Sequence, residues 1–89
     1  MILGTIYMTN GICNAALNNE PFFQEVLTAL DRYRCKDWGN LCDEDKQINE
    51  YALTHNERIL AKYETSKGPI YIITEWDRKT TTILFTDEY

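Results

Sequence analysis

The feature that most constrains this chain is a change of hydrophobic period after Arg58. From there on, apolar and polar residues alternate in short runs, which is the pattern of β-strands and not of helices. The runs are Ile59 to Thr65, Ile70 to Glu75 and Thr80 to Thr86. Because only a few turn residues separate them, neighbouring strands must run antiparallel. The C-terminal part of the sequence therefore predicts a three-stranded antiparallel β-meander.

Before this point the apolar spacing is helical. Pro21 suits the first turn of a helix, and apolar residues then recur every three or four positions, which predicts a helix from about Glu20 to Arg34. A second helix is predicted to start near Asp43, in a first turn rich in acids, and Asn56 suits its end. One face of this second helix carries Ile48, Tyr51, Ala52 and His55. A shorter helix between Gly11 and Asn18 also fits the pattern.

Two to three N-terminal helices followed by a C-terminal three-stranded antiparallel β-meander predict an α+β fold, with the helices packed on one face of the sheet. The first ten residues fit either a short strand or the start of a helix. The chain has 89 residues, which suffices for one hydrophobic core, so we expect residues 1–89 to form a single domain.

Charge and composition narrow the classes of function. A net charge of −5 argues against direct nucleic-acid binding and favours a basic protein partner. No run is long enough to span a membrane, the N-terminus does not resemble a signal peptide, and three cysteines without a CxxC spacing indicate reduced thiols in a cytoplasm. With a single histidine and no phosphate loop, serine elbow or cofactor fingerprint, we expect no metal, no cofactor and no enzyme activity.

A charged knot, Glu75 to Lys79, separates the last two predicted strands. Glu75 and Asp77 leave the same face of a strand, and Asp77-Arg78-Lys79 fits the loose D-x-K half of a nuclease metal site. Charged residues are also what the solvent-exposed tip of a turn requires, and this reading is favoured. Trp76 either packs against the sheet or serves as an exposed contact anchor, and the sequence leaves both open.

A second group of candidate binding residues surrounds the start of the helix near Asp43. Trp38, which follows Asp37 in the connection between the two main helices, either covers the core or anchors a partner. The acids of the next helical turn form a solvated face or a surface complementary to a basic groove: Asp43, Glu44 and Asp45. Catalysis by Cys42 is disfavoured, since the only imidazole belongs roughly 20 Å away at the far end of the helix.

Two stretches, "DRYRCKDWGNLCDEDKQINEYAL" and "IYIITEWDRKTTTILFTDEY", resemble a family of short proteins from bacterial plasmids, phages and other mobile elements. Those proteins share a D-W-G-D-L-x-x-E-D-K-x-x-N core and an I-W-I-I-T-E-x-D-R-x-x-T-T-x-L-F-P-x-E-Y ending. Members are often labelled "type I restriction endonuclease subunit M". This chain lacks the glycine-rich cofactor turn and the N-P-P-[FY] motif of a methyltransferase. It departs from the family pattern at Cys42, at Thr86 and at Trp76, where a Ser, a Pro and a small residue are expected.

The resemblance implies a small accessory protein of a mobile element, a class that includes anti-CRISPR and anti-restriction inhibitors. Our leading hypothesis is a protein that binds a basic defence effector, such as a CRISPR nuclease, and blocks its nucleic-acid groove in the bacterial cytoplasm. Asp37, Trp38, the three helical acids and the Glu75-Trp76-Asp77-Arg78 tip are the expected contact residues. A small metal-dependent nuclease using Glu75, Asp77 and Lys79, and a module that self-associates through a strand edge, for example as a homodimer, are the alternatives.

Overall fold

The computed structural model of the protein describes residues 1–89 and has an α+β fold with three helices and one four-stranded sheet. The helices are α1 (Asn10–Ala16), α2 (Glu20–Arg34) and α3 (Asp43–His55). The strands are β1 (Thr5–Met8), β2 (Ile59–Tyr63), β3 (Ile70–Thr74) and β4 (Thr80–Phe85), and a short 3-10 turn, η1 (Thr86–Glu88), follows. No helix is long and apolar enough to cross a membrane.

The predicted helices are confirmed, and their ends have visible causes. The Asn19 side chain accepts a hydrogen bond from the backbone N–H of Phe22 at the start of α2, and Pro21 lies in its first turn. Asn56 ends α3 in the left-handed conformation, with φ of 52°. The three predicted strands are also confirmed, each ending one or two residues earlier than expected.

The prediction of a purely antiparallel, three-stranded sheet was wrong. The strand order is β1-β4-β3-β2, and β1 pairs in parallel with β4 in the register Thr5 to Thr80 through Met8 to Ile83. The meander β2-β3-β4 is antiparallel, as expected. Strand β1 escapes prediction because its pairing partner lies at the opposite end of the sequence, so no local turn signal links the two.

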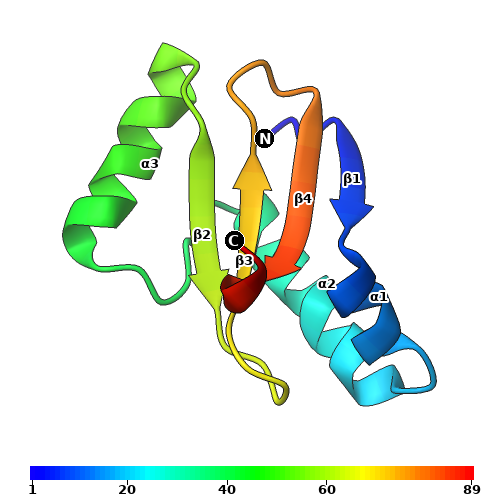
Figure 1. The fold of residues 1–89 in the computed structure, drawn as a ribbon. Helices are drawn as coiled ribbons and strands as arrows, with labels where there is room; N and C mark the ends of the chain where they lie inside the picture. The colour runs from blue at the N-terminus through cyan, green and yellow to red at the C-terminus, as the bar shows by residue number, and fades with distance from the viewer.

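Only one face of the sheet is covered by helix, because α2 crosses behind it (Figure 1). The core lies between them and includes residues from both layers: Phe22, Val26, Leu30 and Tyr33 of α2, and Ile59, Ile70, Ile72 and Ile83 of the sheet. Helix α3 stands beside β2 instead of over the sheet, and η1 lies on the other face (Figure 1). That other face carries no α-helix, although Ile73 and Leu84 on it are buried.

A buried chain of hydroxyl groups joins α2, β3, β4 and the N-terminal segment. The Tyr33 hydroxyl donates to Thr74 Oγ1 at 2.7 Å, the hydroxyls of Thr74 and Thr81 lie 2.8 Å apart, and Thr81 donates to the carbonyl of Leu3 at 2.7 Å. Because the last bond fixes the Thr81 proton on Leu3, Thr74 is the donor to Thr81. The chain leaves every buried hydroxyl paired.

Of the four residues predicted to share one face of α3, only Ala52 is buried. Asn49 and Ala52 are the buried residues of α3, whereas Ile48 and Tyr51 are 59% and 53% exposed, and His55 is exposed as well. Asn49 occupies the inner position because its amide pairs with the backbone of Leu60 in β2, donating to the carbonyl at 2.8 Å and accepting from the N–H at 3.2 Å. The apolar stripe of α3 consequently faces solvent.

Candidate functional site

The tip of the β3–β4 hairpin presents a large aromatic side chain to solvent. Trp76 is 64% exposed, so the structure decides between the two orientations that the sequence left open. The neighbouring Asp77 is exposed too, and Glu75 is half-buried. An exposed tryptophan flanked by carboxylates is the composition of a protein-contact point, because tryptophan is enriched among the residues that dominate binding energy.

The backbone of this tip is held rigidly by Arg78. Arg78 has a left-handed φ of 60°, and its guanidinium donates to the carbonyl oxygens of Ala52 and Glu57 in and after α3, at 2.8 and 2.6 Å. It also donates to the carbonyl of Glu75 at 3.1 Å. These bonds tie the hairpin to the C-terminal end of α3, so Arg78 supports the backbone from which Trp76 projects.

The carboxylates of the tip do not form a metal site. Glu75 Oε2 lies 3.5 Å from the guanidinium of Arg58, and Asp77 Oδ1 accepts a hydrogen bond from the backbone N–H of Lys79 at 3.1 Å, which closes the turn. No three His, Cys, Asp or Glu side chains are grouped so that they could hold a metal ion. The geometry therefore gives these residues structural roles in the hairpin.

Asp37 and Trp38 also have structural roles. Trp38 is 3% exposed, packs edge-on against Tyr33 with ring centroids 5.7 Å apart, and donates its indole N–H to Glu50 at 2.6 Å. Its use as a contact anchor is thereby excluded, and the alternative of a core cover is correct. Asp37 accepts two hydrogen bonds from Arg32 and one from the N–H of Gly39. The bond from Arg32 and that from Gly39 hold the pKa of the Asp37 carboxyl below its usual value.

The acidic first turn of α3 forms a second, separate patch. Asp43, Glu44 and Asp45 are all exposed, as the sequence predicts. Arg78 bonds the hairpin tip to Ala52. Ala52 lies nine residues after Asp43, which is roughly 14 Å at the rise of a helix. The predicted contact residues thus divide into a tryptophan tip at one end of α3 and an acidic turn at the other.

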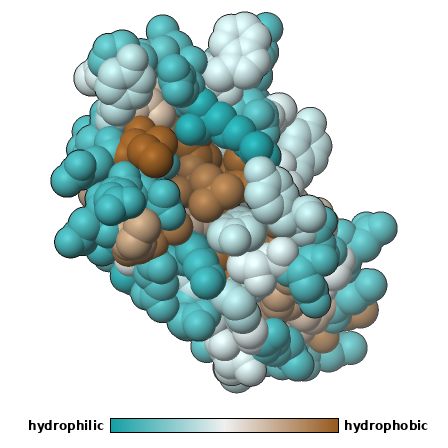
Figure 2. Space-filling model, turned by 60° about the vertical axis from the view of Figure 1, so that its left-hand side comes forward, coloured by the Kyte–Doolittle hydropathy of each residue, from teal (hydrophilic) through white to brown (hydrophobic).

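An apolar hollow lies between these two patches, beside the exposed stripe of α3. It has a volume of about 260 Å³, and its lining consists of Leu41, Asp45, Ile48, Asn49, Arg58 and Leu60. Figure 2, in which the α3 side is turned forward, shows apolar atoms gathered in a recess with a hydrophilic rim. Sequence reasoning missed this hollow because it grouped Ile48 with Ala52 on one face of α3, whereas only Ala52 is buried.

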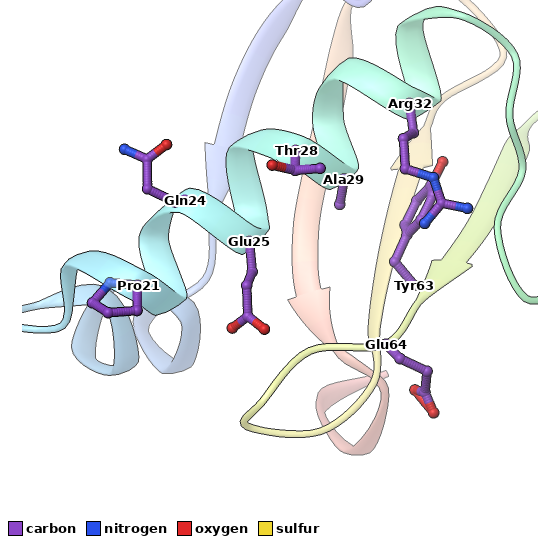
Figure 3. Close-up of a pocket in the computed structure, with 8 residues that line it drawn as sticks. All are labelled: Pro21, Gln24, Glu25, Thr28, Ala29, Arg32, Tyr63 and Glu64. Carbon is purple, nitrogen blue, oxygen red and sulfur yellow. The ribbon is translucent and has the colours of Figure 1, made fainter.

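The second hollow, between α2 and the end of β2, has no convergent chemistry. Its volume is about 250 Å³, and Arg32 lies over the ring of Tyr63 with its guanidinium carbon 5.2 Å from the centroid. Gln24 and Glu64 point away from one another (Figure 3), and Glu25 bonds the backbone and hydroxyl of Ser66. The polar groups of this groove therefore do not point at a common ligand position.

The thiols do not form a nucleophilic centre. Cys13, Cys35 and Cys42 are free and exposed. Cys42 precedes the first turn of α3, and His55 lies in its last turn, where its ring stacks on Tyr51 at 3.6 Å. The two side chains are thus at opposite ends of the helix, as the sequence predicts.

No family model, curated protein or solved structure matches the chain.

Proposed function

We propose that this protein is a non-catalytic inhibitor that binds a basic host defence nuclease, with a CRISPR effector as the target, and occupies its nucleic-acid groove. The observation that carries the proposal is the 64% exposure of Trp76 on a hairpin tip fixed to α3 by Arg78. A rigidly presented anchor loses little conformational freedom on binding, which favours tight association. The mobile-element origin and the bacterial cytoplasm as the place of action are parts of the same proposal.

Charge supports a basic target. The chain carries −5, and the exposed acids of α3 lie on the same helix as the apolar hollow, whose rim includes Asp45. Acidic groups around an apolar centre would pair with Arg and Lys of a nucleic-acid groove, speeding encounter and fixing orientation. The proposed contact surface therefore consists of the Trp76 tip, the hollow and the acidic turn, with Arg78 and Trp38 beneath it as supports.

The test is an inhibition assay with a panel of purified RNA-guided DNA nucleases and restriction enzymes. We expect one of them to lose DNA binding at a near-stoichiometric amount of the protein, with an affinity that weakens between about 0.05 and 0.5 M salt. Trp76→Ala should weaken binding by about 30-fold or more, the effect of losing a central anchor. Thermal unfolding should be unchanged, because the side chain is exposed.

A matched pair of charge variants separates a specific acidic surface from net charge. Asp43→Asn, Glu44→Gln and Asp45→Asn together remove three charges from the exposed turn and should weaken inhibition strongly. Asp31→Asn, Glu64→Gln and Asp87→Asn together remove the same number of charges from exposed acids outside α3 and should leave it unchanged. Inhibition that survives both the Trp76 and the triple variant, or a panel in which no nuclease responds, would contradict the proposal.

A further inference from the structure

The N-terminal segment carries no charged side chain of its own, and the one carboxylate bonded to it is that of Glu88, which accepts from the Thr9 hydroxyl at 2.8 Å. No Asp, Glu, Lys or Arg occurs before Glu20, although 26% of the whole chain is charged. This uncharged segment forms β1 and α1 and exposes apolar side chains, among them Ile2 at 74%, Tyr7 at 53% and Leu17 at 70%. In an acidic protein, such a region is where two copies could meet without bringing like charges together.

The edge strand β1 also lacks the protection that the opposite edge has. Strand β2 is covered by the Asn49 amide and by the backbone of the α2–α3 connection, where Asn40 donates to the carbonyl of Lys62 at 2.7 Å. Strand β1 contains no Lys, Pro or bulge, and no segment lies along its outer side in Figure 1. An edge of this kind offers unpaired backbone groups to another strand.

The register of β1 fixes which groups point outward. Thr5 donates its backbone N–H to the carbonyl of Lys79, just before β4, at 2.9 Å, and Thr9 donates to the carbonyl of Ile83 in β4 at 3.1 Å. Backbone direction alternates along a strand, so the N–H and C=O groups of Tyr7 also point toward β4. Those of Ile6 and Met8 point away from the sheet. These outward groups take part in one long hydrogen bond, from the Cys13 thiol to the Met8 carbonyl at 3.8 Å.

We propose that β1 pairs antiparallel with β1 of a second copy of this chain, about a two-fold axis that passes beside Tyr7. Ile6 then lies opposite Met8 of the second copy, and Met8 opposite its Ile6, with the outward backbone groups of both exchanging hydrogen bonds. Two four-stranded sheets become one continuous sheet of eight strands. A two-fold interface brings the same surface of both copies together, so that surface must be compatible with itself. Strand β1 meets this requirement because it has no charged side chain and has a tyrosine at the axis.

The arrangement accounts for the exposure of Tyr7. In this register Tyr7 faces Tyr7 of the second copy as a non-hydrogen-bonded pair, the closest kind of cross-strand neighbour, on the face of the sheet opposite α2. A basic foreign partner would gain no charge complementarity from this edge, which favours a second copy as the occupant. The dimer does not depend on the proposed inhibition, because α3 packs on β2, at the opposite edge of the sheet from β1.

The first test is the mass of the protein in solution. Sedimentation and light scattering should give about 21 kDa, twice the 10.5 kDa chain, at high concentration. Tyr7→Lys places two cations face to face and should yield the monomer. Tyr51→Lys, at a tyrosine with the same 53% exposure on α3, should leave the dimer intact. A wild-type protein that stays monomeric at several hundred micromolar, or a Tyr7→Lys dimer, would overturn the proposal.

A second test reports the register. In a background with Cys13, Cys35 and Cys42 changed to Ser, all three being exposed, Tyr7→Cys should form a disulfide-linked dimer on mild oxidation. Thr5→Cys should not, because the two Thr5 positions would lie four residues apart along the strands, about 13 Å, beyond disulfide reach. Cross-linking through Thr5 and not through Tyr7 would show that the strands pair in another register and would refute the axis at Tyr7. Tyr7→Lys should inhibit the same nuclease as wild type if both proposals hold.

Discussion

Gly39 lies where the connection between α2 and α3 passes against the outer edge of β2. It forms a bridge with Lys62 and has a left-handed φ of 72°. A Cβ placed there would collide with the carbonyl oxygen of Lys62 and lie 2.7 Å from the ring of Tyr63. The position therefore requires glycine for two separate reasons, its backbone angle and the close approach of a neighbouring strand.

We expect Gly39→Ala to destabilise the protein by more than the left-handed conformation alone accounts for, which is about 1–2 kcal/mol. Gly68→Ala is the matched control, since Gly68 also has a positive φ, of 106°, but no atom lies within 4 Å of the added Cβ. Urea unfolding of both variants measures the two costs. Equal losses of stability would mean that the contact with Lys62 is not tight.

Four residues of the stretch from Asp37 to Asn49 have structural roles that the contacts account for. Asp37 bonds Arg32, Trp38 fills the core, Gly39 reaches β2, and Asn49 pairs with Leu60. Each of these residues is accounted for by closing the β2 edge, without any ligand. These four residues are therefore structural, whereas Glu44 and Asp45 of the same stretch are exposed.

At the scale of elements, a side-chain amide attaches α3 to the edge of the sheet, beside the apolar contacts of Ala52 and Leu53. Asn49 makes both hydrogen bonds that a neighbouring strand would make to Leu60. We expect Asn49→Ala to lower stability by about 1–3 kcal/mol, the effect of leaving buried backbone groups unpaired. It should also speed hydrogen exchange at the Leu60 amide.

Gln47→Ala serves as the control, since Gln47 is an exposed residue of the same helix. It should alter neither the free energy of unfolding nor the exchange rate. Rapid exchange confined to the Leu60 region in Asn49→Ala, measured by NMR, would identify the opened edge. An unchanged Leu60 amide would mean that water or another segment replaces the lost pairing.

Elements whose signals are local could be predicted, and those set by distant contacts could not. Pro21 and a regular apolar spacing define α2 to its last residue, and tight turns define the meander. Which residues of α3 are buried did not follow from apolar spacing, because the Leu60 backbone selects Asn49 while Ile48 stays exposed. The acidic turn was predicted from sequence, but the hollow beside it depends on the exposure of Ile48 and was not.

At the scale of the whole molecule, two buried tyrosines make the free energy of unfolding decrease at alkaline pH. Burial raises the pKa of Tyr33 to about 12, partly offset by its hydrogen bond to Thr74, and burial also raises the pKa of Tyr63. The ordinary value is near 10, so the stabilisation is complete below pH 10 and is lost as the pH rises through the raised values. Unfolding releases protons in this range.

We expect the free energy of unfolding to fall between pH 10 and 12, with Tyr33 contributing about 1.4 kcal/mol per pH unit. Urea unfolding across this range measures the slope. Tyr33→Phe should be less stable than wild type at pH 8, because it loses the bond to Thr74, yet its stability should fall less steeply above pH 10. A variant that falls as steeply as wild type would contradict the role of Tyr33.

The parallel pairing of β1 with β4 has a consequence for how the chain is made. During synthesis β1 emerges first, but its partner strand emerges last among the strands of the sheet, and the bond from Thr81 to Leu3 spans 78 residues. Until β4 leaves the ribosome, β1 is an unpaired apolar strand. Contacts of such separation slow folding. The four-stranded sheet therefore forms only after its last strand has been translated. A ribosome paused before Thr80 would hold a chain in which the meander lacks β4 and β1 has no partner strand.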